Sequence, residues 1–176
     1  MVVSGALVVT ALCPSGREAV LGLLGPGQPF GQATLVAGRQ RGTARALGRC
    51  VIEGLEPMEA AQALAARCDA LEEWLADLVL LDVPARVAKR LCELAGLVGR
   101  HGPDGVLIEV PLTQAQLASL AAATRESANR ALARIARDGV VRRVGRGYLV
   151  TDHRALHRIA GREQDSGAVP GVLRHW

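Results

Sequence analysis

The sequence predicts an α+β protein made of a small β-domain, one long helix, and a C-terminal domain of short helices followed by a hairpin. Residues 1–57 alternate short β-branched runs with Gly and Pro, which is typical of short strands joined by tight turns. Residues 58–81 contain neither Gly nor Pro, which favours a single helix. Residues 82–176 hold two closely spaced helical patterns and then an apolar run broken by Gly. We therefore expect three domains with these boundaries.

The N-terminal apolar run is predicted to be a strand and not a signal peptide. The segment MVVSGALVVTALCPSG mimics a short signal core, but it lacks a basic start and contains Ser4, Gly5 and Thr10. No apolar run in the chain reaches the ~18 residues that a membrane span needs. We expect a cytoplasmic protein that does not associate with membranes.

The cysteines are far apart and form no Cys-x-x-Cys pair, so no zinc site is predicted from them. Thinly spread cysteines favour reduced, mostly buried thiols in a cytosolic protein. The four residues concerned are Cys13, Cys50, Cys68 and Cys92. We expect neither a metal nor a cofactor.

The net charge of +4 hides a strong asymmetry along the chain. Residues 50–112 carry five bases against eleven acids, a balance of −6. Residues 113–176 carry eleven bases against five acids, a balance of +6. A basic end beside an acidic middle favours a polyanion partner for the C-terminal domain. A basic surface that is merely solvated is the alternative.

The long helix carries an apolar seam whose members step by four, three, four and three residues. The seam consists of Leu64, Cys68, Leu71, Leu75 and Leu78. Charges are expected to fill its flanks, namely Arg67, Asp69, Glu72, Glu73 and Asp77. Such a heptad seam favours a parallel pairing of two chains. A lone amphipathic helix that packs on its own domain is the alternative. The segment DVPAR at Asp82–Arg86 ends the long helix, and another helix is expected to begin there with Pro84 in its first turn.

Two short helices follow with almost no linker between them. Thr113 can cap a helix over Gln114–Ala121, and Thr124 can cap a second one over Arg125–Arg137. Gly139 ends the second helix. Two helices joined by a turn of three or four residues make a helix-turn-helix, whose second helix enters the major groove of DNA. An ordinary helical hairpin is the alternative.

The second helix and the hairpin after it carry the residues expected to contact DNA. Arginine reads guanine and Glu can accept from cytosine, so the first turns of the helix suit the reading of G·C pairs. Base contacts are predicted for Arg125, Glu126, Asn129 and Arg130, while Ala128, Leu132 and Ile135 face inward. The segment GVVRRVGRGYLVT is expected to form a two-stranded wing. Backbone contacts are predicted for Thr113, Thr124, Ser127, Arg134, Arg142, Arg143 and Arg146.

The stretch LTQAQLASLAAATRESANRALARIARDGVVRRVGRGYLV resembles the winged helix-turn-helix of the Crp/Fnr family of transcription regulators. TRESANR matches the family's S/T-R-E-T/S-V-x-R pattern, except that Ala128 stands where the family usually has Val. The resemblance implies that Arg125, Glu126 and Arg130 set the specificity. It extends to a dimerisation helix before DVPARVAKRL and to the second half of a β-roll of the cyclic-nucleotide-binding type. The expected fold is thus a partial β-roll, a long dimerisation helix and a C-terminal winged helix-turn-helix.

The residues that the family uses for a cyclic nucleotide are altered in this sequence. The family's Gly-Glu pair for the ribose becomes Gly31-Gln32, and its Arg-Ser pair for the phosphate falls on Arg41-Gly42, with Thr43 next to it. Gln32 lacks the carboxylate that would hold a ribose hydroxyl, so we expect no dependence on cyclic AMP. An iron–sulfur cluster would need an N-terminal cysteine cluster, which this sequence lacks, so no such cluster is expected. Haem would need a histidine as its axial ligand, and all the histidines of the sequence lie outside the roll, so haem is not expected either.

The chain begins inside the roll of the family. The resemblance implies that about fifty further residues would complete it, since a roll without them exposes strand edges. Either the codon for Met1 is an internal one or the domain is naturally reduced.

The sequence therefore predicts a homodimeric, sequence-specific DNA-binding regulator acting on a twofold-symmetric operator, with RNA polymerase as a further candidate partner. A regulator controlled by its own abundance and one that senses an unidentified effector both remain open. A protein-interaction module that kept the fold is the second class. An enzyme is not expected, because no nucleophile, base and acid are brought together by the sequence.

Overall fold

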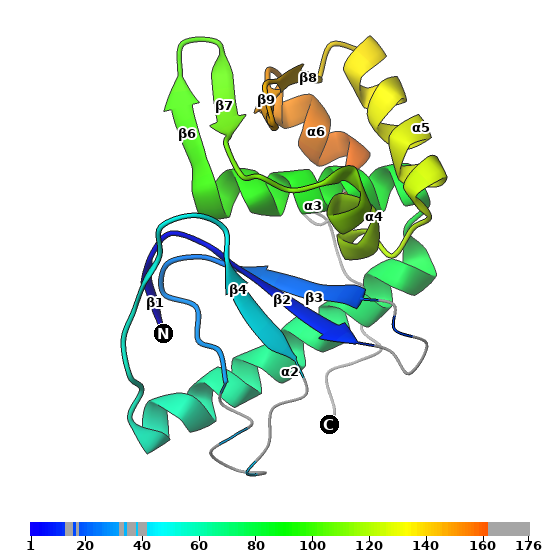
Figure 1. Cartoon of the computed structure of the whole chain (residues 1–176). Coiled ribbons are helices and arrows are strands. Elements are labelled where there is room, and N and C mark those ends of the chain that lie inside the picture. The colour runs from blue at the N-terminus through cyan, green and yellow to red at the C-terminus, as the bar shows by residue number, and fades with distance from the viewer. Residues whose placement is uncertain (13–15, 17, 32–33, 35–37, 39–41, 162–176) are drawn as a thin grey trace.

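The computed structural model describes residues 1–12, 16, 18–31, 34, 38 and 42–161 (Figure 1). The strands of the first part are β1 (Val2–Ser4), β2 (Leu7–Leu12), β3 (Glu18–Leu24), β4 (Thr43–Ala46) and β5 (Val51–Ile52). Two long helices follow, α2 (Pro57–Leu80) and α3 (Val83–Val98). The remaining elements are β6 (Gly99–Gly102), β7 (Gly105–Ile108), α4 (Gln114–Leu120), α5 (Arg125–Arg137), β8 (Val141–Val144), β9 (Gly147–Val150) and α6 (His153–Ile159).

The N-terminal strands form two small antiparallel sheets, in the orders β3-β2-β4 and β1-β5. Strand β2 lies at the centre of the larger sheet, with Leu7 opposite Leu24 on one side and Ala46 on the other. Val2, Leu7 and Leu24 make a small apolar cluster against which Phe30 packs. The predicted strands and turns of this region are therefore present.

The long helix α2 has 24 residues and spans about 36 Å at 1.5 Å per residue. Its start is marked by Pro57 in the first turn and by Glu59, whose carboxylate accepts the N–H of Glu56 at 3.1 Å. It ends at Leu80, and Asp82 caps α3 by accepting the N–H of Ala85 at 2.9 Å. The two long helices are thus separated by a short elbow.

The C-terminal part packs four helices against a sheet of order β6-β7-β9-β8. Helix α3 supplies the centre of the core, with Val87, Ala88 and Leu91 fully buried. The hairpin of β6 and β7 was not predicted from the sequence, and neither was α6. The turn between β6 and β7 is Pro103-Asp104, and Gly105 follows it as the first residue of β7, which is a local signal for a hairpin.

The N-terminal sheet packs directly on the helix-turn-helix. Figure 1 shows β2 and β3 between α2 on one side and α3 with α4 on the other. Val8 and Val20 of the sheet belong to the same buried cluster as the C-terminal core. The N–H of Val20 on the edge strand β3 donates to Ser119 Oγ of α4 at 2.8 Å. The predicted fold class, a partial roll with a long helix and a winged helix-turn-helix, is confirmed.

One group of charges on the long helix is buried against α3. Asp77 was expected on a flank of the seam, and the structure adds that it is buried there, with only 7% of it exposed. Its carboxylate bonds Lys89 Nζ and Arg90 Nη2 of α3, both at 2.7 Å. Lys89 also bonds Glu73 Oε1 at 2.7 Å. The sequence did not indicate this burial, which arises because α3 folds back at the elbow and brings Lys89 and Arg90 onto this side of α2.

The expectation of mostly buried thiols is also wrong for the described residues. Cys92 is buried in the core of α3, Cys50 is half-buried, and Cys68 is exposed on α2. Cys68 is exposed because it belongs to the apolar seam, whose central part is left uncovered by the described residues. Cys13 lies outside the described residues.

Candidate nucleic-acid interface

The two short helices begin at the caps that the sequence predicts. Thr113 Oγ1 accepts the N–H of Gln116 at 3.2 Å, and the Gln116 side chain accepts the N–H of Thr113 at 2.9 Å. Thr124 Oγ1 accepts the N–H of Ser127 at 3.1 Å and starts α5. Each such cap contributes about 1 kcal/mol to helix stability. The caps fix where α5 begins, and so which residues occupy its first turns.

The turn between α4 and α5 is held from outside by Arg86. Its Nε donates to the carbonyl of Ala121 at 2.8 Å, and its Nη2 donates to that of Ala122 at 3.3 Å. Its Nη1 donates to the carbonyl of Leu81 at 2.6 Å, at the elbow between the long helices. Ala122 adopts a φ of +45°, a left-handed conformation that costs about 1–2 kcal/mol for a residue with a Cβ. Arg86, which sequence reasoning missed, therefore ties the turn to the elbow.

The inner face of α5 fixes its orientation. Ala128 and Ile135 are fully buried, Ala131 is nearly so, and Leu132 packs partly against the same core. The small side chain of Ala128 lets α5 lie close against α4, with which it makes extensive contacts. The three residues that the sequence placed on the inner face do lie there.

The outer face of α5 presents Arg125, Glu126 and Arg130 to solvent. Arg130 forms an ion pair with Glu126 one turn before it, and its Nη2 donates to Ser127 Oγ at 3.1 Å. Thr124 Oγ1 donates to the same Ser127 oxygen at 3.0 Å. The side chains at the start of α5 are thus linked to one another, which lowers the entropy they lose when they bind a ligand.

Asn129 lies at the edge of this face. The residue is half-buried, and its Oδ1 is enclosed with no hydrogen-bond partner within the described part of the chain. Arg134 and Arg137 lie further along α5 and are exposed. The exposed arginines of α5 therefore extend from its first turn to its last.

The predicted wing is the hairpin of β8 and β9. Arg142 and Arg143 lie on β8 and Arg146 in the turn, and all three are exposed. The Arg143 guanidinium carbon lies 5.9 Å from the centre of the Tyr148 ring, within the range of a cation–π contact. Burial raises the pKa of Tyr148, and the charge of Arg143 opposes that rise. The wing thus adds exposed cations to those of α5, within the same C-terminal part (Figure 1).

Only part of the predicted effector pocket can be described. Gly31 has a φ of +76°, and Thr43 begins β4 and is exposed. A Cβ on Gly42 would lie 3.1 Å from the carbonyl oxygen of Thr10, so β2 packs closely there. Gln32 and Arg41 lie outside the described residues.

The predicted seam of α2 lies partly open. Leu64 and Leu78 are half-buried, while Cys68, Leu71 and Leu75 are exposed. Leu75 is 57% exposed, and Val79, one turn further on, is 83% exposed. Val79 thus extends the exposed apolar stripe beyond the predicted seam.

In the described part of the chain, no helix is long and apolar enough to cross a membrane. No group of His, Cys, Asp or Glu there could hold a metal ion.

A capped helix-turn-helix, an arginine-rich outer helix and a basic wing define a winged-helix DNA-binding protein with an N-terminal β-domain. Residues 85–159 match the family model of the Crp-like helix-turn-helix domain, and residues 1–66 match that of the cyclic nucleotide-binding domain. The chain is 31% identical to a CRP-like cAMP-activated global transcriptional regulator of Mycobacterium tuberculosis, over 91% of this chain and 78% of that protein. It is 30% identical to the transcriptional regulator LdrP of Thermus thermophilus, over 89% and 84% of the two chains.

The solved structures agree with these matches. A CRP-family transcriptional regulator from Thermus thermophilus superposes with a TM-score of 0.79 at 30% identity, covering 91% of this chain and 86% of that one. A second CRP/FNR-family regulator from the same organism has a TM-score of 0.76 at 22% identity and the same coverage, which shows a shared fold. The chain belongs to the Crp/Fnr family. It is a DNA-binding transcription regulator and not an enzyme.

Proposed function

We propose that this regulator binds a twofold-symmetric operator as a homodimer and reads G·C pairs through the first turns of α5. The observation that carries this proposal is the exposed group of Arg125, Glu126 and Arg130 at the start of a capped helix, in which Arg130 is ion-paired with Glu126. These side chains have the donors and acceptors that guanine and cytosine edges match. The burial of Asn129 Oδ1 makes it a weaker candidate for base contact than the other three.

The remaining polar residues of this surface are assigned to the DNA backbone. Side chains and N–H groups at helix starts suit phosphate oxygens, because a helix N-terminus carries partial positive charge. We therefore assign Thr113, Thr124 and Ser127 to phosphates near the two helix starts. Contacts along the groove edges are assigned to the arginines further out, namely Arg134, Arg142, Arg143 and Arg146.

The homodimer is supported by the stripe of Cys68, Leu71, Leu75 and Val79 on α2, which is exposed in a single chain. An exposed apolar stripe along one side of a helix is stabilised when a second helix covers it. The two chains would then be related by a twofold axis along α2. A twofold protein places its two reading helices about one DNA turn, or roughly 34 Å, apart.

We further propose that DNA binding does not require cyclic AMP and that the protein acts in the cytoplasm, where its operator is. Gln32 stands at the position where the nucleotide-binding members of the family have Glu. A glutamine side chain carries no charge, so it cannot provide the charge-assisted hydrogen bond of a carboxylate. A relative whose name states activation by cAMP is 31% identical to this chain. We therefore base the proposed independence from cyclic AMP on the altered binding positions and not on the overall similarity.

The experiment that tests the proposed reading helix compares Arg130→Ala with Arg142→Ala on a library of randomised DNA sites. Arg130→Ala should cost about 1–3 kcal/mol per half-site and relax the preference at one base-pair position. Arg142→Ala should weaken binding to all sequences alike and lower the slope of log affinity against log salt by about one. Adding cyclic AMP should leave the wild-type curves unchanged.

The two variants serve as controls for each other, since both remove one exposed arginine from the same domain. If Arg130→Ala lost affinity uniformly and kept the wild-type preference, α5 would not be the reading helix. If the wild type bound all sequences equally, a protein-interaction role of the fold would be favoured instead.

A further inference from the structure

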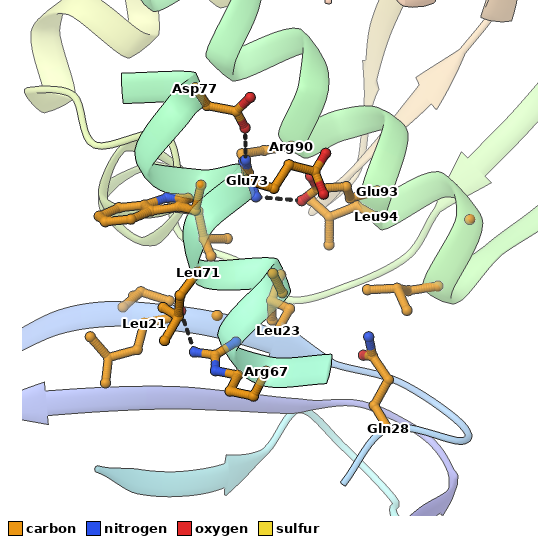
Figure 2. A pocket seen from close by; sticks show the side chains of 17 residues that line it. Leu21, Leu23, Gln28, Arg67, Leu71, Glu73, Asp77, Arg90, Glu93 and Leu94 are labelled. Atoms are coloured by element: carbon orange, nitrogen blue, oxygen red, sulfur yellow. Dashed lines mark hydrogen bonds and ion pairs between the residues drawn. The ribbon is translucent and has the colours of Figure 1, made fainter. Parts of the chain in front are cut away.

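Two arginines of α3 hold the elbow between the long helices in different ways. Arg90 pairs with the carboxylates of Asp77 and Glu93, both at 2.7 Å, beside a cavity of about 350 Å³ where β3, α2, α3 and α4 meet (Figure 2). Arg86 lies one turn earlier on α3, and its guanidinium makes three hydrogen bonds within the described residues, all to main-chain carbonyls. Arg86 therefore holds backbone positions, whereas Arg90 neutralises side-chain charges.

The carbonyls that Arg86 binds lie at the ends of two different helices. Leu81 is the C-cap of α2, Ala121 is the C-cap of α4, and Ala122 follows Ala121. The C-terminal end of a helix carries partial negative charge, which a nearby cation stabilises. Neither α2 nor α4 has a basic residue in its own last turn. Arg86 thus supplies, from a third helix, the cation for both helix ends.

Helix α4 ends in a Schellman motif with an unfavourable residue in it. The N–H groups of Ala122 and Ala123 donate back to carbonyls of the last turn of α4, at 3.0 Å and 2.9 Å, and Ala122 has a φ of +45°. Gly is the residue that adopts this conformation without strain. The motif satisfies two carbonyls inside α4, and the next two, those of Ala121 and Ala122, are the ones that Arg86 binds. Arg86 therefore completes a turn that is strained by its own sequence.

This turn leads directly into the reading helix. Thr124, the cap of α5, comes two residues after Ala122, and the exposed Arg125 and Glu126 follow it. A hydrogen bond weakens steeply when its donor is misaligned, so contacts to base edges depend on the angle of α5. A shift of the turn would change that angle for every side chain on the outer face of the helix.

We propose that Arg86 is a positioning residue for DNA reading. By joining the ends of α2 and α4, it sets the angle at which α5 presents Arg125, Glu126 and Arg130 to the bases. Arg86 is half-buried and engaged with carbonyls, so it contacts no DNA itself. The effect on reading rests on the proposed function, whereas the tethering of the turn does not.

Hydrogen exchange of the free protein tests the tethering without DNA. The N–H groups of Ala122 and Ala123 are protected by the Schellman bonds, so their exchange reports on opening of the turn. Arg86→Gln should speed their exchange by about tenfold or more relative to the buried Leu91 of α3, because the carbonyl bonds of the guanidinium are lost. Unchanged exchange at both alanines would overturn the proposal.

Asp82→Ala is the matched control for stability. Its carboxylate accepts the N–H of Ala85 at 2.9 Å, so the variant loses the cap of α3 at the same elbow but no bond to the α4–α5 turn. Asp82→Ala should leave the exchange of Ala122 and Ala123, relative to Leu91, at the wild-type value. Equal effects of Asp82→Ala and Arg86→Gln on these two amides would show that Arg86 acts only through general stability.

The effect on reading is measured with the library of randomised DNA sites. Arg86→Gln should lower operator affinity by about tenfold or more and flatten the preference at several positions of each half-site, because a misaligned α5 loses more than one base contact. The slope of log affinity against log salt should stay at the wild-type value, since no phosphate contact is removed. Asp82→Ala should keep the wild-type preference.

Adding Ala122→Gly to Arg86→Gln separates stability from positioning. Gly suits the φ of +45°, so the double variant should fold and should regain part of the stability that Arg86→Gln loses in urea denaturation. It should not regain the base preference, because the turn still lacks its bonds to Arg86.

Three results would overturn the positioning role, namely a wild-type preference in Arg86→Gln, a salt slope lowered by one, or a preference restored by Ala122→Gly. Each of them would leave the proposed function standing, because the wild type and Arg130→Ala are measured in the same series. A wild type without any base preference would instead overturn the proposed function, and with it the role of Arg86 in reading.

Discussion

Replacement of Asp77 with Ala is expected to lower the free energy of unfolding by about 3–5 kcal/mol, because it removes the shared partner of two largely buried cations. Asp77 Oδ1 binds Lys89 and Oδ2 binds Arg90, each at 2.7 Å. The side chains of Lys89 and Asp77 are 8% and 9% exposed. Urea denaturation at a fixed protein concentration measures the loss.

Glu109→Ala is the control for an ion pair in solvent. Glu109 pairs with Arg100 at 3.1 Å, and the two side chains are 57% and 76% exposed, so its removal should cost less than about 1 kcal/mol. Adding Lys89→Met to Asp77→Ala should recover part of the stability, since it removes a largely buried ammonium that would then keep only Glu73 as a partner. If Asp77→Ala lowered the free energy of unfolding no more than Glu109→Ala does, the buried ion pairs of Asp77 would not stabilise the fold as proposed.

The same cluster determines the pH range over which Lys89 stabilises the fold. Burial lowers the pKa of Lys89, but its bonds to Asp77 and Glu73 outweigh burial and raise the pKa above the ordinary value of 10.5. A raised folded pKa contributes stability that is fully present below the unfolded pKa and is lost as pH rises through the folded pKa. The contribution is therefore intact at neutral pH and declines only in strongly alkaline solution.

Replacement of Leu75 with Glu is expected to give monomers. Leu75 is 57% exposed at the centre of the stripe on α2, so in the proposed dimer two carboxylates would face each other across the axis. A monomer contacts one half-site at a time, and loss of the second half-site should reduce operator affinity by about 100-fold or more. Analytical ultracentrifugation and operator titration measure the two effects.

Leu80→Glu is the matched control, because Leu80 is 78% exposed but lies about 140° around the helix from Leu75. It should leave the dimer intact. Cys68 offers an independent check, since it is an exposed seam residue that would face its counterpart across the axis. Mild oxidation should link two wild-type chains and should not link Cys68→Ser chains. A monomeric wild type at micromolar concentration would contradict the dimer.

Local signals made the helix-turn-helix predictable. A cap uses a side chain and an N–H three residues away, so Thr113 and Thr124 reveal both helix starts without knowledge of the rest of the fold. The inner face of α5 follows in the same way from the 3.6-residue period, as Ala128 and Ile135 show.

Features that depend on contacts distant in sequence could not be predicted. Asp77 is 12 residues from Lys89, and its burial depends on how α3 folds back over α2 at the elbow. The bond between Val20 and Ser119 joins residues 99 apart, and the cavity exists only because the two parts pack together there. The role of Arg86 depends likewise on carbonyls 35 and 36 residues away.

The hairpin of β6 and β7 is a different case, because its signal was present in the sequence. Its strands are only four residues each, the turn between them is Pro103-Asp104, and Gly105 begins the second strand. Short strands with few β-branched residues are hard to distinguish from loops. Pairing of Ile108 with Tyr148 of β9 stabilises the hairpin through a distant contact.

Selection of bound fragments from a randomised duplex library tests whether two copies of α5 read one symmetric operator. We expect an enriched site of two inverted half-sites, each with G·C pairs, whose centres lie about one helical turn apart. Arg130→Ala should enrich the same symmetric site with one position relaxed in each half. Enrichment of a single unrepeated motif, or no enrichment above the starting library, would show that two copies of α5 do not read one symmetric operator.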